Sequence, residues 1–290
     1  MNIYKKSDIP EHLQKYFEPA EIGLEQTPEQ YVAAMVEVFR CVRDVLADDG
    51  TLWLNIGDSY AGAGYSNNKN TGGTARADGG KQRHLTGTGC KSKDLIGIPW
   101  MLAFALRADG WYLRQDIIWH KPNPMPESVR DRCTKAHEYI FLLSKSERYF
   151  FDSEAMREPA AQPVGTPRKT GQHKSEVFKH AGTLGSNQGS DTRNRRSVWT
   201  VATRPYKGAH FATFPPALIE PCILAGSRPG DIVLDPFMGS GTTAAVALQH
   251  GRQYLGCELN PEYGPLQDQR VAKASPAVAP QMGLFLEESA

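Results

Sequence analysis

The fold of this chain is decided by the stretch Val233-Leu-Asp-Pro-Phe-Met-Gly-Ser-Gly-Thr-Thr243. A short apolar strand leads into a Gly-x-Gly turn, which opens a helix, and the next predicted strand ends at Glu258. Glycines let the backbone approach a ligand, and a carboxylate at the end of the next strand can accept hydrogen bonds from ribose hydroxyls. The stretch therefore predicts an α/β sheet that binds a nucleotide or nucleoside cofactor, with these candidate contacts: Asp235, Gly239, Gly241, Thr242 and Glu258.

The same glycines fit a loose dinucleotide pattern, so an NAD-dependent oxidoreductase is an alternative. Two features count against it. The glycine turn lies near the end of the chain, so the rest of the sheet must come from residues before it. The turn also lacks a phosphate-binding lysine, and Asp235 suits a cationic or amino-bearing ligand better than a pyrophosphate.

Outward from this stretch, apolar periodicity predicts strands that alternate with helices. Such alternation is typical of a mainly parallel sheet covered on both faces. The predicted helices span residues 27–47, 99–108, 216–225 and 244–250, and the predicted strands span 51–56, 111–119, 138–143, 149–151, 231–234 and 254–257.

Composition excludes several classes of protein. The 290 residues are 40% apolar and 22% charged, which argues against a disordered chain. No apolar run is long enough for a membrane helix, and residues 1–20 lack the apolar stretch of a signal peptide. The five cysteines form no C-x-x-C pair, and no metal-binding constellation is visible. We expect a cytoplasmic protein with reduced thiols and no bound metal.

The formal charge of +1 conceals an uneven distribution. Residues 61–95 and 154–200 are polar, glycine-containing insertions with a net charge of +4 each, which leaves −7 for the remainder. Either insertion alone could be a solvated surface loop. Two of them in one chain favour a surface that contacts nucleic acid.

The runs Asp235–Thr243 and Glu258-Leu-Asn-Pro-Glu-Tyr263 closely resemble the S-adenosylmethionine segment of bacterial site-specific DNA amino-methyltransferases. The resemblance is to the permuted group in which the catalytic region precedes the cofactor region. It extends from about Ile22 to Tyr263, and further matching segments are 22–25, 50–60, 119–124, 135–140 and 210–215.

This resemblance implies a Rossmann-like methyltransferase sheet and methyl transfer from S-adenosylmethionine to adenine N6 or cytosine N4 of double-stranded DNA, in a restriction-modification setting. A flipped target base would lie beside the cofactor. Residues implied to bind the cofactor are Phe211, Thr213, Pro215, Phe237, Gly239, Glu258 and Asn260.

The resemblance also implies residues that contact DNA. Trp119, His120, Lys121 and Asn123 match a segment near the target base, although a proline-rich turn with Trp119 in the core is the competing interpretation. The insertion at 154–200 would carry much of the target recognition, with phosphate or base contacts from Arg193, Arg195 and Arg196.

One family motif is missing from the matching order. The catalytic tetrapeptide, Asp or Ser followed by Pro-Pro and an aromatic residue, is absent from residues 1–25, where it would precede Ile22. Three explanations stay open: an internal start, a degenerate relative, or a substitute acceptor and stacking ring from Asp58 and Tyr60 at the end of strand 51–56. A catalytically silent DNA- or cofactor-binding relative is accordingly the main alternative function.

The sequence divides into a methyltransferase domain, residues 1–273, and a tail, residues 274–290. In the tail, Gln281, Leu284 and Phe285 form a Gln-x-x-Leu-Phe run similar to peptides by which bacterial DNA enzymes dock on the replication sliding clamp. A tail that folds back on its own domain is the alternative. Whether the protein is a monomer or a homodimer is left open by the sequence.

Overall fold

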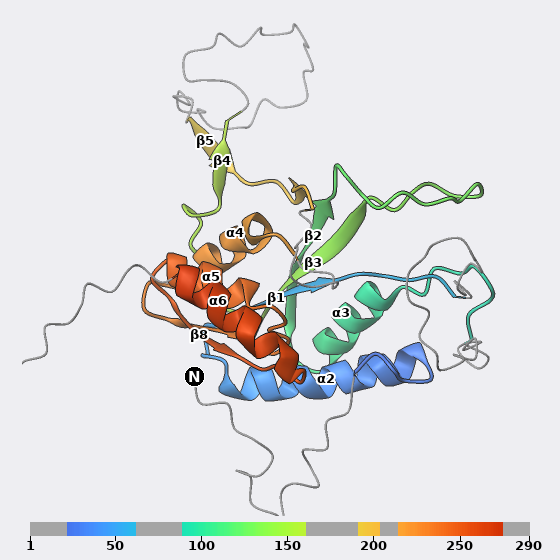
Figure 1. The fold of residues 1–290 in the computed structure, drawn as a ribbon, viewed down its shortest axis with the longest axis horizontal. Coiled ribbons are helices and arrows are strands. Elements are labelled where there is room, and N and C mark those ends of the chain that lie inside the picture. The colour runs from blue at the N-terminus through green and yellow to red at the C-terminus, as the bar shows by residue number, and fades with distance from the viewer. Residues whose placement is uncertain (1–21, 62–88, 161–190, 204–213, 275–290) are drawn as a thin grey trace, which may run out of the picture.

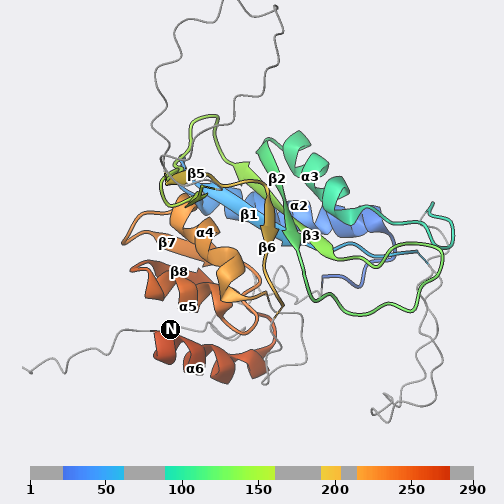
Figure 2. The ribbon, with the colours of Figure 1, turned by 90° about the horizontal axis from the view of Figure 1, so that it is seen from above.

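The computed structural model describes residues 22–61, 89–160, 191–203 and 214–274, and Figures 1 and 2 show how their helices and strands are arranged. In chain order the elements are α2 (Pro28–Val45), β1 (Thr51–Ile56), α3 (Ile98–Ala108), β2 (Tyr112–His120), β3 (His137–Ser144), β4 (Arg157–Pro159), β5 (Thr192–Asn194), β6 (Val198–Thr200), α4 (Pro216–Gly226), β7 (Ile232–Asp235), α5 (Thr242–Gln249), β8 (Gln253–Gly256), the 3-10 helix η2 (Pro261–Tyr263) and α6 (Gly264–Ala274).

Helix α2 confirms the prediction of a helix over residues 27–47. Its start is fixed by a capping box, in which the Thr27 hydroxyl accepts from the Gln30 backbone N–H at 3.2 Å and the Gln30 side chain accepts from Thr27 N. Pro28 occupies the first turn, where its missing N–H leaves no bond unmade. The buried residues recur at helical spacing along one face: Val32, Met35, Val36, Phe39 and Val42.

The main sheet has the strand order β1-β3-β2-β6. Strand β3 runs antiparallel to both β1 and β2, whereas β2 and β6 are parallel. The prediction of a mainly parallel sheet is therefore wrong for these strands. The connection from β2 to β3 contains no helix, and a chain that returns without a crossover helix pairs antiparallel.

The segment 149–151 is not the strand that its aromatic residues predict. It is irregular and held by other contacts: the Phe150 backbone N–H donates to the Asp49 carbonyl at 2.8 Å. The ring of Phe151 stacks on Trp53 of β1 with centroids 6.3 Å apart. Packing of the rings, rather than a strand ladder, fixes this segment.

Two apolar clusters cover the two faces of the main sheet. Helices α2 and α3 pack on one face around Leu54, Phe141 and Leu143. Helix α4 packs on the other face around Ile117 and Ile140. Neighbouring residues of β3 thus serve opposite cores, as the alternation of side chains along a strand requires.

Strands β7 and β8 form a second, parallel pair connected through α5. Helix α4 ties this pair to the main sheet at Gly226, where an added Cβ would lie 2.6 Å from Thr51 Oγ1 and 2.8 Å from Trp53 Nε1. Among the described residues, no strand pairs with the second edge of β1 or with the second edge of β7. The Rossmann-like sheet is present there as two separate pieces.

Strands β4 and β5 pair antiparallel and form the stem of an arm. Figure 1 shows this stem standing beyond α4, away from the main sheet. The structure describes residues 154–160 and 191–200 of the 154–200 insertion, which include both strands, and residues 161–190 lie outside the described ranges. We call residues 154–160 and 191–197 the arm stem.

No helix in the described ranges is long and apolar enough to cross a membrane. No two of the five cysteines form a disulfide with each other. The described residues include no group of three or more His, Cys, Asp and Glu side chains that could hold a metal ion.

Candidate functional site

The glycine turn between β7 and α5 has an open side. Gly239 has φ +50°, and an added Cβ there would meet only the Phe237 carbonyl oxygen, at 3.9 Å. The backbone at Gly239 is therefore accessible to a ligand that approaches closely. Phe237 beside it leaves 48% of its surface exposed while its ring meets Phe39 of α2 edge-on, with centroids 6.4 Å apart.

Glu258 lies directly over this turn, just beyond β8. Its Oε2 accepts from the Gly239 N–H and its Oε1 from the Asn260 N–H, both at 2.8 Å. The side chain is exposed, and a carboxylate has about four acceptor positions, so Glu258 retains capacity for ligand hydroxyls. Asn260 uses its own side-chain oxygen to cap η2 through the Glu262 N–H.

Tyr263 completes this acidic edge. Desolvation, followed by the negative charges of Glu258 and Glu262, raises the pKa of Tyr263 above its ordinary value. Its phenol therefore stays protonated at neutral pH and keeps a hydrogen-bond donor next to the carboxylates.

Two predicted cofactor residues brace the turn from inside. Asp235 Oδ1 accepts from the Phe237 N–H at 3.0 Å, and its Oδ2 accepts from the Thr243 hydroxyl at 2.5 Å. Thr242 is buried and accepts a hydrogen bond from Arg270. The contacts of Asp235 and Thr242 thus lie within the protein and shape the turn.

Helix α6 supplies supports that sequence reasoning missed. Gln267 is buried, and its Nε2 donates to the Gly239 carbonyl at 2.7 Å. Gly241, with φ +80°, packs so closely on Gln267 that an added Cβ would lie 3.3 Å from its Cα. Arg270 also donates to the Ser240 hydroxyl at 3.0 Å. In the sequence, the only sign of this support is the three-residue spacing that places Gln267 and Arg270 on one face of the helix.

The segment predicted to lie near the target base is mostly engaged in the fold. Trp119 is 3% exposed, and its indole N–H donates to the Val201 carbonyl at 2.8 Å. Of the two interpretations of this segment, the burial of Trp119 favours the one that places its ring in the core. The Asn123 side chain binds the backbone of Thr203: its Nδ2 donates to the Thr203 carbonyl and its Oδ1 accepts from the Thr203 N–H, both at 3.0 Å.

His120 and Lys121 lie at the end of β2 and are partly accessible. The His120 Nδ1 lies 3.1 Å from the Thr200 hydroxyl. Lys121 pairs with Glu138 of β3, and its ammonium lies 4.3 Å from the centroid of the Trp119 ring. These contacts hold the end of β2 against β3 and β6, and the charge of Lys121 is balanced by that of Glu138.

Asp58 and Tyr60 follow β1 and are held by their neighbours. Asp58 Oδ1 accepts from three backbone N–H groups, those of Ser59, Gly97 and Ile98, at 2.9, 3.0 and 3.2 Å. It thereby caps α3, whose own N-cap glycine has no side chain to do so. The Arg132 guanidinium lies over the Tyr60 ring, 4.0 Å from its centroid. Both side chains have structural partners.

The arm stem holds the three arginines predicted to contact DNA. Glu158 Oε1 accepts from Arg193 Nε at 2.9 Å and from Arg196 Nε at 3.0 Å. Desolvation works to raise the pKa of Glu158, but the hydrogen bonds from Arg196 and Arg193 outweigh it and lower the pKa below its ordinary value. Arg195 instead lies over the ring of Trp199, with its Cζ 5.3 Å from the centroid.

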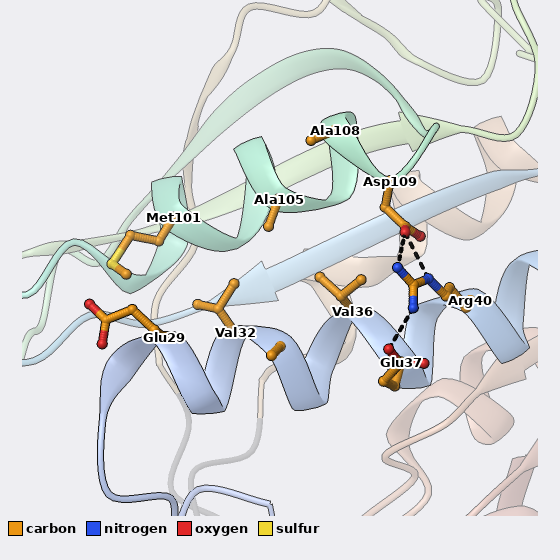
Figure 3. Close-up of a pocket in the computed structure, with 10 residues that line it drawn as sticks. Glu29, Val32, Val36, Glu37, Arg40, Met101, Ala105, Ala108 and Asp109 are labelled. Atoms are coloured by element: carbon orange, nitrogen blue, oxygen red, sulfur yellow. Dashed lines mark hydrogen bonds and ion pairs between the residues drawn. The ribbon is translucent and has the colours of Figure 1, made fainter.

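Another cavity is a groove of about 630 Å³ between α2 and α3 (Figure 3). Val32, Val36, Met101 and Ala105 line it, and at one end Arg40 bonds to Asp109 and Glu37. The charged lining residues Arg40, Asp109 and Glu37 already bond to one another, and most of the remaining lining is apolar, whereas a nucleoside needs several available polar partners. We therefore place the candidate cofactor site at the glycine turn.

Five residues singled out from the sequence lie outside the described ranges: Phe211, Thr213, Gln281, Leu284 and Phe285. Pro215, predicted with the first two, is the N-cap residue of α4. Its fixed φ of −72° starts that helix.

Known proteins resemble this chain along most of its length. Residues 7–267 match the family model described as DNA methylase, for N6 and N4 methyltransferases. The chain is 48% identical over 265 residues to the Type II methyltransferase M.SmaI of Serratia marcescens, an alignment that covers 90% of this chain and 80% of that protein. It is 50% identical over 263 residues to M.XycI of Xanthomonas campestris pv. cyanopsidis, covering 89% and 77%.

Solved structures share the fold. PvuII DNA methyltransferase (cytosine-N4-specific) superimposes with a TM-score of 0.56 at 18% identity, over 87% of this chain and 74% of that one. A candidate DNA modification methylase of Thermus thermophilus, solved with S-adenosyl-L-methionine, gives a TM-score of 0.53 at 24% identity, over 86% and 79%. At these identities the similarity is one of architecture.

Proposed function

Because this chain belongs to the N6/N4 DNA methylase family, we propose that it methylates one exocyclic amino group within a specific duplex sequence, as the modification partner of a Type II restriction enzyme. The chain is a DNA amino-methyltransferase that uses S-adenosylmethionine. What remains to be assigned is which of its residues hold the cofactor and the DNA. The open glycine turn under Glu258 is the observation that carries the assignment.

The residues at this turn fit the cofactor. Gly239 leaves room for close approach to the backbone, and the exposed ring of Phe237 offers an apolar wall for an adenine. Glu258 can accept from both ribose hydroxyls while it remains anchored to Gly239 N and Asn260 N. Asp235, Thr242 and Gln267 hold the turn in shape from behind.

The bound cofactor supplies an electrophilic methyl group on a sulfonium. The task of the protein is to bind it, to orient the base amino nitrogen toward that methyl, and to exclude water, because alignment contributes much of the rate in such transfers. We assign no acceptor role to Asp58 and Tyr60, since Asp58 caps α3 and Arg132 covers one face of the Tyr60 ring. The arm stem lies beyond α4 and is the proposed base of the target-recognition region.

The test is methylation of duplex DNA. Purified protein is incubated with S-adenosylmethionine and unmethylated genomic DNA, which is then digested to nucleosides and analysed by mass spectrometry. We expect N6-methyladenine or N4-methylcytosine, and sequencing of modified DNA should find it at one recognition sequence. Cofactor binding by calorimetry without methyl incorporation would instead support a catalytically silent relative.

We also propose that the tail docks on the replication sliding clamp through Gln281, Leu284 and Phe285. The support is the sequence run itself, followed by Glu287 and Glu288. Clamp-coated beads should retain the wild-type chain and release a Leu284→Ala/Phe285→Ala double variant. Equal retention of the two forms would refute the proposal, and a tail folded on its own domain would then be the better interpretation.

A further inference from the structure

A small cleft of about 150 Å³ opens at the base of the arm stem, where β6 joins the main sheet. Its lining includes no Asp or Glu, and its polar lining residues are Gln115, Ser153, Asn194, Arg195, Arg196 and Ser197. Since a water molecule occupies about 30 Å³ of liquid, the cleft has room for a phosphate group with some hydration. Its charge and size suit an anion.

Arg195 is the residue that makes this cleft distinctive. Its Nε is buried and has no hydrogen-bond partner within the described chain, and no described carboxylate forms an ion pair with its guanidinium. The stacking on Trp199, itself only 4% exposed, fixes the guanidinium in place. The Nε atom itself has no accessible surface, whereas Arg195 as a whole is partly exposed and lines the cleft, so an anion would meet the guanidinium at its accessible atoms.

The two neighbouring arginines differ from Arg195 in this respect. Arg193 and Arg196 both donate to the same oxygen of Glu158, which lies across the stem on β4. Their charges are partly neutralised, and they join the two strands of the stem. Of the three arginines, Arg195 alone keeps its guanidinium without a carboxylate in the described structure.

We propose that this cleft binds one phosphodiester of duplex DNA, with Arg195 as its charged ligand. The proposal rests on the proposed function, because the arm then lies against DNA. The Ser153 and Ser197 hydroxyls and the Asn194 amide are donors of the kind that contact DNA phosphates. Such a contact carries no sequence information, so it positions the arm for reading elsewhere.

The experiment compares duplex binding by the full chain and its variants, by fluorescence anisotropy over a series of salt concentrations. Each phosphate contact contributes about 0.9 to the slope of log affinity against log salt on B-DNA. Arg195→Gln should therefore reduce the magnitude of this slope by about 0.9, and weaken binding at 0.1 M salt by about eightfold. Arg107→Gln on α3 removes the same charge from an exposed site outside the cleft and should leave both values unchanged.

A second variant guards against misfolding of Arg195→Gln. Asn194 is exposed, so Asn194→Asp places a carboxylate at the cleft without opening the core, and it should weaken DNA binding while the thermal midpoint stays within 1–2 °C (about the effect of a surface substitution). Unchanged affinity in that variant, or an unchanged salt slope in a folded Arg195→Gln, would overturn the proposal.

The source of the anion is tested separately. Inorganic phosphate is titrated into the wild-type chain by calorimetry and used as a competitor for DNA. Weak phosphate binding that Arg195→Gln abolishes, together with the altered DNA slope, supports the proposal. Phosphate binding without any change of the DNA slope would make the cleft a free-anion site and overturn it. If the wild type itself does not bind duplex DNA, the proposed function fails, and the cleft proposal fails with it.

Discussion

At the scale of single residues, Glu258 links the protein fold to the proposed ligand. One carboxylate holds two backbone N–H groups, those of Gly239 and Asn260, and faces solvent above them. The ligand-free turn is thus already organised by the same side chain that would bind the ribose. Preorganisation of this kind lowers the entropy lost on binding.

Glu258→Gln should weaken S-adenosylmethionine binding by about 10- to 100-fold, since it removes a charge-assisted acceptor worth roughly 1.5–3 kcal/mol. Methylation at saturating cofactor should fall much less, because the side chain is proposed to contact the ribose and not the reacting methyl. Calorimetry gives the affinity and methyl incorporation the rate. Glu262→Gln is the matched control, four residues further along the same exposed segment. A cofactor affinity that is equal in all three proteins would contradict the assignment.

A substitution at Trp119 tests whether its ring stabilises the core or contacts the target base. Trp119→Phe removes the indole donor from the core and leaves the half-buried Val201 carbonyl without it. We expect the free energy of unfolding to fall by about 1–3 kcal/mol, with the DNA affinity of the folded protein nearly unchanged. Urea denaturation and anisotropy measure the two quantities. Tyr112→Phe, at the exposed start of β2, is the control. If Trp119→Phe has normal stability but weakened DNA binding, Trp119 contacts the target base after all.

At the scale of elements, the arm stem depends on few interactions. Its strands β4 and β5 are three residues each, too short to be stable by pairing alone. Glu158 accepts from Arg193 and Arg196, and Arg157 donates to the Thr192 hydroxyl at 2.7 Å. Hydrogen bonds and ion pairs of charged side chains therefore hold β4 and β5 of the arm stem together.

The stem should loosen in acid. The folded-state pKa of Glu158 is lowered from 4.5, so the stabilisation from this carboxylate is present above pH 4.5 and is lost as the pH falls through the lower folded-state value. Protection of the β4 and β5 amides, measured against the intrinsic exchange rate at each pH, should fall over that range ahead of protection in β1 and β3. Glu158→Gln should show the lower protection already at pH 7. Protection in the stem that is independent of both pH and this substitution would refute the prediction.

The elements also show what sequence could and could not predict. Capping residues and local periodicity sufficed for α2, and the glycine turn with Glu258 was found from spacing alone. Strand direction was missed, because nothing local in residues 137–144 specifies that β3 turns back between β1 and β2. The capping role of Asp58 was missed for the same reason, since its partner Gly97 is far along the chain. The core position of Trp119 was one of two interpretations that the sequence left open, and the distant Val201 carbonyl decides between them.

At the scale of the whole molecule, net charge takes on a structural meaning. The sequence assigned +4 to residues 154–200, but pairing across the stem neutralises part of it within the protein. Arg195, which forms no ion pair with a described carboxylate, lines the cleft together with Arg196, which shares Glu158 with Arg193. A count of charges along the chain predicts a basic arm, whereas only the fold distinguishes arginines that build it from one that can bind.

The two pieces of sheet should respond to the cofactor as one body. Helix α4 packs between them, Arg228 pairs with Asp49 at 3.0 Å, and the rings of Phe39 and Phe237 meet across the junction. S-adenosylmethionine at 100 times its dissociation constant contributes about 2.7 kcal/mol to the free energy of unfolding, which for a chain of this length raises the thermal midpoint by about 4 °C. Calorimetry should show a single transition that moves as a whole, and at the same cofactor concentration Glu258→Gln should shift much less. Two transitions, of which only one responds to the cofactor, would mean that β7 and β8 melt independently of the main sheet.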